Sequence, residues 1–409
     1  MYSYKQGIIM SVTGLLIFFA FCQHKVSDSL NRSTQSGEIF NQNILPADYN
    51  LNEYLPHLKN KRVGVVVHPC SVVKDKFLVD TLLVLGVNVQ TIFAPEHGFR
   101  GIADAGELIN NEVDSKTGIK IISLYGKNKK PTGEQLKDLD VILFDLQDVG
   151  ARFYTYLSSL HYVMEACNEN NKKLIVLDRP NPNGHFVDGP VLEDDCKSFI
   201  GIHPIPVVHG MTLGELALMI KGEGWIKNSS ALDLQIIHCN NYKHSSRYIL
   251  PVKPSPNLPN EISILLYPSI CLLEGTCISL GRGTESPFQI YGHPSFVNYD
   301  TTFTPLSIPG AKTPPLLNQM CKGYSLRNAS IDSLRKNPGL NLAHILNSYK
   351  EYKGKEDFFL KNNFIDLLIG NKFFKEQIQS GMNEFQIKES WKEKLNQFKI
   401  LRKKYLLYD

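Results

Sequence analysis

A carboxylate, an imidazole and a guanidinium follow closely on an apolar run in the stretch "APEHGFRG", residues 94–101. Polar groups gathered where a buried strand stops either cap the backbone or handle a ligand. Capping explains a lone Asp ahead of a helix, but it does not explain a Glu-His pair inside a long loop. We therefore take Glu96, His97 and Arg100 as candidate site residues.

Other apolar runs end in polar side chains in the same way. The residues that follow them are His68 and Ser71, then Tyr125, then Asp145, Gln147, Asp148 and Arg152, and finally Asp178, Arg179 and Asn181. Carboxylates, arginines and aromatic rings are the groups that glycosidic bond cleavage needs. In that reaction one carboxyl group protonates the leaving oxygen, and another attacks the sugar or activates water.

The runs that precede these residues have the pattern of strands covered on both faces. They are rich in Val and Ile and span residues 62–68, 87–94, 120–126, 141–147 and 173–180. A helical pattern over 152–170 and another over 212–221 lie in the same region, the second with Thr212 and Glu215 spaced as a capping box. Strands alternating with helices predict an α/β fold with a Rossmann-like, doubly wound parallel sheet. Ligands bind beyond the carboxyl ends of such strands, where the polar residues gather.

Several function classes lack their motifs. The chain has no GxGxxG after the first strand, no GxxxxGK[ST], no HExxH and no GxSxG, so we expect no nucleotide cofactor and no serine nucleophile. The net charge of +4 is small, which gives no electrostatic case for nucleic acid. A metal-dependent hydrolase or deacetylase using His97, Asp104, Asp145 and His209 stays open as an alternative, although no compact ligand motif is present.

The N-terminus has the pattern of a bacterial lipoprotein signal. Lys5 precedes the apolar residues 7–21, and Cys22 closes a stretch shorter than the roughly 20 residues of a membrane span. We expect residues 1–22 to be a signal with Cys22 lipidated, and 23–45 to be a polar linker. The protein would then be exported to the periplasmic or cell-surface side and touch the membrane only through its lipid. A signal anchor and a simple secreted form are the alternatives.

The stretch from 267 to 294, "YPSICLLEGTCISLGRGTESPFQIYGHP", is the densest of the second half. We expect a helix ending at Glu274 and Gly275, then a short strand and a turn. Gly281 and Gly283 would permit a tight backbone that brings Arg282 close to a ligand. The alternative is an ion pair of Arg282 with Glu274 or Glu285.

Long motifs along the chain resemble the NamZ family of exo-β-N-acetylmuramidases. They are "APEHGFRG", "DAGE", "FDLQDVGARFYTY", "LDRPNP", "DGP", "HGMTLGELA" and "LLEGTCISLGRGTESPF". The resemblance covers about Asn43 to the C-terminus. It implies removal of N-acetylmuramic acid from the non-reducing end of peptidoglycan fragments. It also implies a Rossmann-like domain over 46–255 and a smaller α/β domain over 256–409 that completes the cleft.

The resemblance also assigns roles to residues. Glu96 matches the general acid or acid/base, and Glu274 the second carboxylate or a substrate hydrogen-bonding group, with Asp145, Asp148 and Glu107 as rivals for that role. The expected substrate-binding residues are His97, Arg100, Asp145, Arg152, Tyr154, Asp178, Arg179, His209 and Arg282.

Muramic acid carries a lactyl carboxylate, which a guanidinium binds through two parallel hydrogen bonds. Arg100, Arg152, Arg179 and Arg282 are the candidates for this contact. A lipoprotein that binds muropeptides without cleaving them is a further alternative, which a turnover assay separates from the enzyme.

Overall fold

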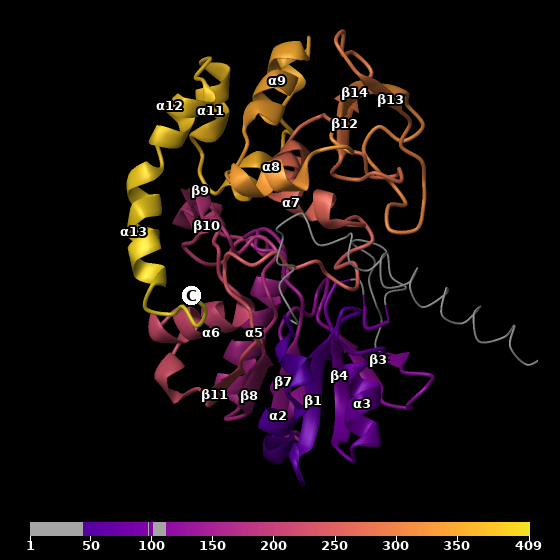
Figure 1. Ribbon diagram of the computed structural model, residues 1–409, viewed down its shortest axis with the longest axis vertical. Helices are drawn as coiled ribbons and strands as arrows, with labels where there is room; N and C mark the ends of the chain where they lie inside the picture. Colours follow the sequence, from indigo (N-terminus) through magenta and orange to yellow (C-terminus); the bar gives the residue numbers. More distant parts are fainter. Residues whose placement is uncertain (1–43, 97, 101–111) are drawn as a thin grey trace, which may run out of the picture. The chain divides into compact units, whose positions relative to one another are not determined.

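The computed structural model describes residues 44–96, 98–100 and 112–409 (Figure 1). Cys22, His97, Asp104 and Glu107 lie outside the described residues. The described residues belong to one compact unit. Within the described ranges, none of the helices combines the length and the apolar character needed to span a bilayer.

A seven-stranded sheet forms the centre of the first part of the chain, in the order β11-β8-β7-β1-β4-β6-β5. Six strands run parallel, and β5 joins the edge antiparallel to β6. Their bounds are β1 Arg62–Val67, β4 Asn88–Ala94, β5 Glu112–Val113, β6 Lys120–Ser123, β7 Val141–Asp145, β8 Lys173–Leu177 and β11 Leu234–Ile237. The five predicted strands are all present, and the predicted parallel α/β sheet is confirmed.

Helices cover both faces of the sheet, as continuous apolar strands require. Val63, Val65 and Val67 of β1 pack in one cluster with helices α2 (Leu51–Leu58) and α3 (Leu78–Val84). Val66 belongs to the cluster on the other face, where it joins side chains of three further helices. These are α4 Gly133–Leu136, α5 Tyr156–Glu169 and α6 Leu213–Gly222.

Two helices are predicted in this region; one has the predicted N-terminal cap, and the other begins later than predicted. The capping box at α6 is confirmed, because Thr212 Oγ1 accepts from Glu215 N at 3.2 Å and Glu215 Oε2 accepts from Thr212 N at 2.9 Å. The helix predicted from residue 152 begins only at Tyr156. Arg152 N donates instead to Val207 O at 2.8 Å, and Ala151 bridges Val208, so this segment pairs with a neighbouring strand before the helix starts.

Smaller elements lie beside the sheet. Two antiparallel pairs are β2 Val72–Val73 with β3 Lys76–Phe77, and β9 Asp188–Val191 with β10 Pro206–Val208. Short 3₁₀ turns are η1 Ala47–Tyr49, η2 Asp194–Cys196 and η3 Ser229–Ala231. The pair β9 and β10 lies between the parallel sheet and the C-terminal helices in Figure 1.

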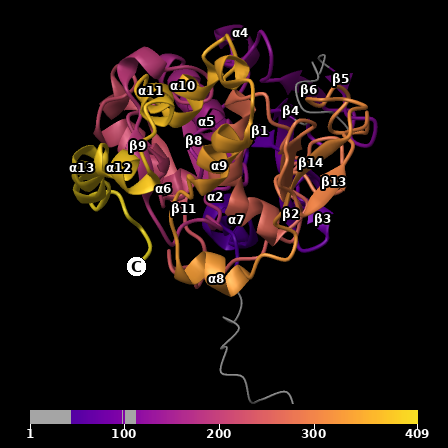
Figure 2. The ribbon, with the colours of Figure 1, turned by 90° about the horizontal axis from the view of Figure 1, so that it is seen from above.

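The rest of the chain forms a smaller α/β region. Its helices are α7 Glu261–Ile270, α8 Ile331–Lys336, α9 Ala343–Glu351, α10 Phe364–Ile369, α11 Phe374–Gln379, α12 Glu384–Glu389 and α13 Lys392–Arg402. The strands β12 Ile290–His293, β13 Thr301–Phe303 and β14 Cys321–Ser325 form an antiparallel sheet, and η4 Cys271–Gly275 and η5 Lys355–Asp357 are 3₁₀ turns. In Figure 2, α12 and α13 lie on one side of this region, and β13 and β14 on the other.

The C-terminal tail returns to the parallel sheet. Arg402 Nη1 donates to Gly210 O at 2.7 Å, and Leu407 N donates to Glu215 Oε1 at 2.8 Å. Tyr408 donates its hydroxyl to Asp178 Oδ2 at 2.7 Å. The end of the chain therefore holds the start of α6 against the end of β8.

Candidate active site

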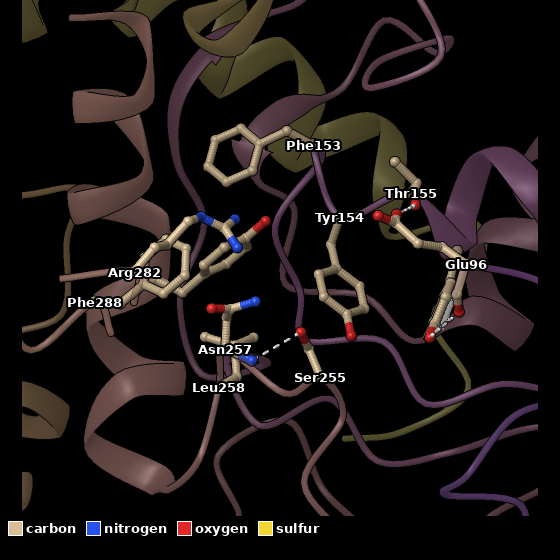
Figure 3. Close-up of a pocket in the computed structure, with 11 residues that line it drawn as sticks. Glu96, Phe153, Tyr154, Thr155, Ser255, Asn257, Leu258, Arg282 and Phe288 are labelled. Atoms are coloured by element: carbon tan, nitrogen blue, oxygen red, sulfur yellow. Dashed lines mark hydrogen bonds between the residues drawn. The ribbon is translucent and has the colours of Figure 1, made fainter. Parts of the chain in front are cut away.

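A cavity lies beyond the carboxyl ends of the parallel strands and holds Glu96 and Arg282 in its wall (Figure 3). Its volume is about 80 Å³, which is room for part of a saccharide. The lining residues come from the loops after β4 and β7, from the segment before α7, and from α7 and the turn after it. They are Glu96, Phe153, Tyr154, Thr155, Tyr156, Ser255, Asn257, Leu258, Tyr267, Arg282 and Phe288. We name it the Glu96 cavity.

Glu96 is half-buried and held by hydroxyl groups. Thr155 Oγ1 donates to Glu96 Oε2 at 3.3 Å, and the Tyr156 hydroxyl donates to the Glu96 carbonyl at 3.4 Å. Partial burial, and next the negative charge of Glu96, raise the pKa of Tyr125 to about 12. Tyr125 therefore keeps its proton at neutral pH. Thr155 thus holds the carboxyl group of Glu96, and Tyr156 holds its backbone, at the wall of the cavity.

Aromatic rings form the apolar wall of the Glu96 cavity. The ring centroid of Tyr154 lies 4.9 Å from that of Tyr156 and 5.9 Å from that of Tyr267, both edge to face. The Tyr154 hydroxyl donates to Pro254 O at 2.8 Å, which ties the loop after β7 to the segment before α7. Tyr154 therefore lies where the sequence places it, in the wall of a cavity with a carboxylate.

Arg282 forms an ion pair with Glu274, as the sequence allowed. Nε and Nη2 of Arg282 donate to the same oxygen, Glu274 Oε1, at 2.8 and 2.6 Å. Burial by itself lowers the pKa of Arg282, but the carboxylate of Glu274 outweighs burial, and the net shift is upward. The guanidinium also lies 5.0 Å from the centre of the Phe288 ring. Arg282 is thus fixed as a cation at the cavity wall.

The turn around Arg282 needs its glycines. Gly281 and Gly283 have φ of 81° and 80°, in the left-handed region. A Cβ on Gly283 would lie 2.5 Å from Leu306 O, closer than atoms can approach. Glu274 precedes this turn in η4, and it lines a second cavity, of about 570 Å³, that it shares with Arg282. Glu274 is not among the residues that line the Glu96 cavity.

Three of the four candidate arginines are held by other protein groups and do not line the Glu96 cavity. Arg152 is buried, and its guanidinium donates to the carbonyls of Pro190, Ile205 and Leu368 at 2.9, 2.8 and 2.9 Å. It therefore joins β9, the start of β10 and α10, and it does not line the Glu96 cavity, so its expected contact with the lactyl group stays a prediction.

Arg100 is likewise held by protein carboxylates. It donates from Nε and Nη2 to Asp114 at 2.8 Å each, and from Nη2 to Asp80 at 3.3 Å. Its guanidinium also lies over the rings of Phe77 and Phe99. The side chain packs against α3 rather than lining the Glu96 cavity, so the structure does not bring it to Glu96.

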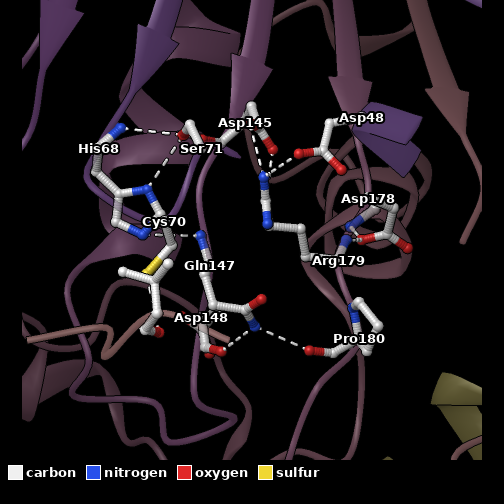
Figure 4. Close-up of polar contacts among 12 residues, drawn as sticks. Asp48, His68, Cys70, Ser71, Asp145, Gln147, Asp148, Asp178, Arg179 and Pro180 are labelled. Atoms are coloured by element: carbon white, nitrogen blue, oxygen red, sulfur yellow. Dashed lines mark hydrogen bonds and ion pairs between the residues drawn. The ribbon is translucent and has the colours of Figure 1, made fainter. Parts of the chain in front are cut away.

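Arg179 is engaged within the sheet rim (Figure 4). It donates to both carboxylate oxygens of Asp145 at 2.5 and 2.9 Å and to Asp48 Oδ2 at 2.6 Å, and all three residues are buried. Burial raises the pKa of Asp48 to about 7, although Arg179 opposes the shift. Neither Asp145 nor Arg179 lines the Glu96 cavity. They form a buried ion-pair network that joins the end of β7 and the residues after β8 to η1, and their expected substrate contact stays a prediction.

Asp178 and His209 are also internal. Asp178 accepts from Thr212 Oγ1 at 2.6 Å, from Gly214 N at 2.8 Å and from Tyr408, so it anchors α6. His209 is buried, and its Nδ1 accepts from Met211 N at 3.2 Å. Burial lowers the pKa of His209 to about 3, so the ring is neutral at pH 7. Neither residue lines the Glu96 cavity, and their expected contact with substrate stays a prediction.

Residues that the sequence reasoning missed come mainly from one loop. Ser255, Asn257 and Leu258 precede α7 in the stretch "PSPNLPN" and line the Glu96 cavity. Asn257 N donates to Ser255 Oγ at 3.2 Å, and Asn257 Nδ2 donates to Gly310 O at 2.8 Å. The clustered prolines were the available signal, because they mark an ordered loop rather than a strand or helix. Thr155, next to the predicted Tyr154, also lines the cavity.

A metal site of the predicted alternative kind does not assemble in the described ranges. Among these residues no group of three or more His, Cys, Asp and Glu side chains is placed to hold an ion. Asp145 is occupied by Arg179, and His209 lies 4.0 Å from Asp148. His97 and Asp104 lie outside the described residues.

Comparison with known proteins adds to this geometry. Family models described as the N-terminal and C-terminal parts of the exo-β-N-acetylmuramidase NamZ match residues 63–262 and 265–408. The chain belongs to the NamZ family. It is 37% identical to the peptidoglycan β-N-acetylmuramidase NamZ of Bacillus subtilis (strain 168), over 99% of this chain and 100% of that protein. This member of the NamZ family is therefore a glycoside hydrolase.

Two solved structures share the fold. Both are described as DUF1343 family proteins from Bacteroides fragilis NCTC 9343, and each match covers 90% of this chain and 99% of the other. One is 47% identical with a TM-score of 0.83, and the other is 30% identical with a TM-score of 0.76. The fold of this chain is thus shared by both solved structures. The family models divide between 262 and 265, while the predicted boundary after residue 255 stays a prediction.

Proposed function

We propose that this protein removes N-acetylmuramic acid from the non-reducing end of peptidoglycan fragments, with Glu96 as the general acid. The observation that carries the proposal is the position of Glu96. It follows a strand of the parallel sheet, is held by Thr155 and Tyr156, and faces a cavity walled by aromatic rings. A carboxyl group positioned in this way can protonate the oxygen of a leaving sugar.

The second carboxylate of the proposed pair is Glu274, acting with Arg282. The ion pair leaves Glu274 partly exposed, with a side-chain exposure of 22%, so the group remains accessible. Its negative charge is compensated by the guanidinium, which favours a role in substrate binding over one as an unpaired nucleophile. Asp145, a rival for the second role, is held by Arg179 and lies outside the Glu96 cavity.

Among the four candidate arginines, all of them described, Arg282 is the one that lines the Glu96 cavity. We assign to it the contact with the lactyl group that distinguishes muramic acid from glucosamine. A planar guanidinium offers parallel N–H donors to a carbonyl or carboxylate, which an ammonium group does not.

The test of the proposed function is turnover of a synthetic muramyl-glucosamine disaccharide. We expect release of free N-acetylmuramic acid, no internal cleavage of polymeric glycan, and an unchanged rate with EDTA. Loss of activity with EDTA and its recovery with zinc would instead favour the metal-dependent alternative. Saturable binding without turnover would favour a muropeptide-binding protein.

We further propose that the protein is exported and anchored by a lipid on Cys22. The support is the sequence pattern of residues 1–22, since Cys22 lies outside the described residues. Metabolic labelling with a palmitate analogue should mark the wild-type protein and not the Cys22→Ala variant. Equal labelling of both would refute the anchor.

A further inference from the structure

The second cavity borders the Arg282–Glu274 ion pair. Its volume is about 570 Å³, and Arg282 lines both it and the Glu96 cavity. Apolar side chains form much of its wall, among them Leu280, Pro314, Leu360 and Phe364. Arg282 is the residue that the two lining sets have in common. We name it the Arg282 cavity.

The ion pair determines which ligand group binds favourably next to Arg282. Two hydrogen bonds to Glu274 Oε1 neutralise the guanidinium, so the pair as a whole carries no net charge. A carboxylate placed there would be repelled by the negative charge of Glu274 as well as attracted by the positive charge of Arg282. An amide carbonyl accepts hydrogen bonds without that repulsion.

We propose that the Arg282 cavity receives the beginning of a peptide joined to the lactyl group of the sugar, so that the enzyme accepts peptide-bearing muramic acid. The inference rests on the proposed function. In muramic acid the lactyl carboxyl group is the point at which a peptide is attached as an amide. With the reacting carbon at Glu96 and the lactyl group at Arg282, the peptide leads away from Glu96 into the second cavity.

The walls fit small apolar peptide side chains. Leu280 and Pro314 are buried, while Leu360 and Phe364 are half-buried, so the cavity offers apolar contact without a closed end. Ala311 and Thr313 also line it and carry short side chains. A larger residue at either position would take up space that a peptide needs and leave the Glu96 cavity unchanged.

The experiment compares three disaccharides that differ only at the lactyl group: the free acid, the methylamide, and the L-alanyl-D-isoglutamine amide. For the wild-type enzyme we expect kcat/KM on the dipeptide amide to equal or exceed that on the free acid. Ala311→Trp should lower kcat/KM on the dipeptide amide by about tenfold or more, while the other two substrates change by less than about twofold.

Two further variants keep the test decisive. Thr313→Trp, at an exposed position on the same cavity, should act like Ala311→Trp if the latter fails to fold. Ala329→Trp, at a half-buried alanine outside both cavities, should change none of the three rates. The proposal is overturned if the wild-type enzyme disfavours the dipeptide amide by more than about tenfold, or if filling the cavity slows all three substrates equally. Failure to cleave any of the three would refute the muramidase function itself.

Discussion

Arg282 and Glu274 are joined through a single carboxylate oxygen, which accepts from both Nε and Nη2 of the guanidinium. The arrangement fixes Arg282 in the wall that two cavities share. It also couples the two residues, because removal of either leaves a partly buried charge without its partner. Substitutions at this pair should therefore change recognition of the lactyl group more than they change the stability of the distant parallel sheet.

Arg282→Lys should reduce the preference for muramic acid over glucosamine. An ammonium group keeps the charge but loses the planar set of donors, so we expect a loss of about 1 to 3 kcal/mol in transition-state binding of the muramide. The measurement is kcat/KM for an aryl muramide relative to the matching aryl glucosaminide. Arg100→Lys is the control, since Arg100 is held by Asp114 and Asp80. An unchanged preference in the Arg282 variant would place recognition elsewhere.

Glu96→Gln should keep the fold and product binding but lose at least ~100-fold in turnover of the natural disaccharide, the usual scale for a missing general acid or base. An aryl muramide with an activated leaving group needs no protonation, so it should restore most of the rate. Glu134→Gln, on the exposed surface of α4, is the charge-matched control. Near-normal turnover by Glu96→Gln would exclude Glu96 as the acid.

Arg152→Met should destabilise the protein without changing its substrate preference. The carbonyls of Pro190, Ile205 and Leu368 would lose their donor, at a cost of about 3 kcal/mol or more. Urea unfolding measures the effect, and Arg62→Met, at an exposed ion pair, should cost less than about 1 kcal/mol. A selective loss of muramide preference would instead return Arg152 to the binding site.

Asp148→Asn should flatten the dependence of stability on pH. Burial raises the pKa of Asp148 to about 7, from an unfolded value of 3.8. Between these two values the folded state keeps a proton that the unfolded state has lost. The contribution of Asp148 to the free energy of unfolding therefore falls as pH rises, by about 1.4 kcal/mol per pH unit, and levels off above pH 7. In urea titrations from pH 4 to 8 the variant should lack this contribution, while buried Asp48, whose pKa is also raised to about 7, keeps its own in both proteins. Identical slopes would show that Asp148 is ionised in the folded protein.

Tyr408→Phe should destabilise the contact between the C-terminal tail and the sheet. Its hydroxyl donates to the buried Asp178 and accepts from Cys239 N at 3.0 Å. Loss of both bonds should cost about 1 to 3 kcal/mol in thermal or urea unfolding. Tyr299→Phe, on an exposed ring, should stay within about 0.5 kcal/mol of the wild type. An equal, small effect of both would mean that water replaces the Tyr408 hydroxyl.

The sheet could be predicted from the sequence because each strand carries its own apolar pattern, independent of distant residues. The runs in β1, β4, β6, β7 and β8 are apolar on both faces, which is a property of each strand alone. The sixth parallel strand, β11, was missed, because Leu234 and Gln235 are only half-buried and the run is short. The start of α5 was misplaced because residues 151 and 152 pair with β10, a contact across more than fifty residues that no periodicity reveals.

The site was predicted in part for the same reason. The sequence placed Glu96 and Tyr154 beyond the strand ends, and there they line one cavity. The sequence could not show which of Arg152, Arg179 and Arg282 lines the cavity, because all three occur in motifs rich in polar side chains. What separates them is the set of acceptors around each one, and those acceptors come from distant segments such as Leu368 and Asp48.

The tail contacts impose an order on the folding of the newly made chain. Tyr408 and Leu407 bond to Asp178 and Glu215 across separations of 230 and 192 residues. During synthesis α6 and the end of β8 emerge long before residues 407 and 408, so they lack these two partners at first. The parallel sheet can assemble while later residues are still being made, but the buried Asp178 and Glu215 gain their full set of donors only once residues 407 and 408 have emerged. The native contacts of β8 and α6 are thus completed by residues made much later than the strand and the helix themselves.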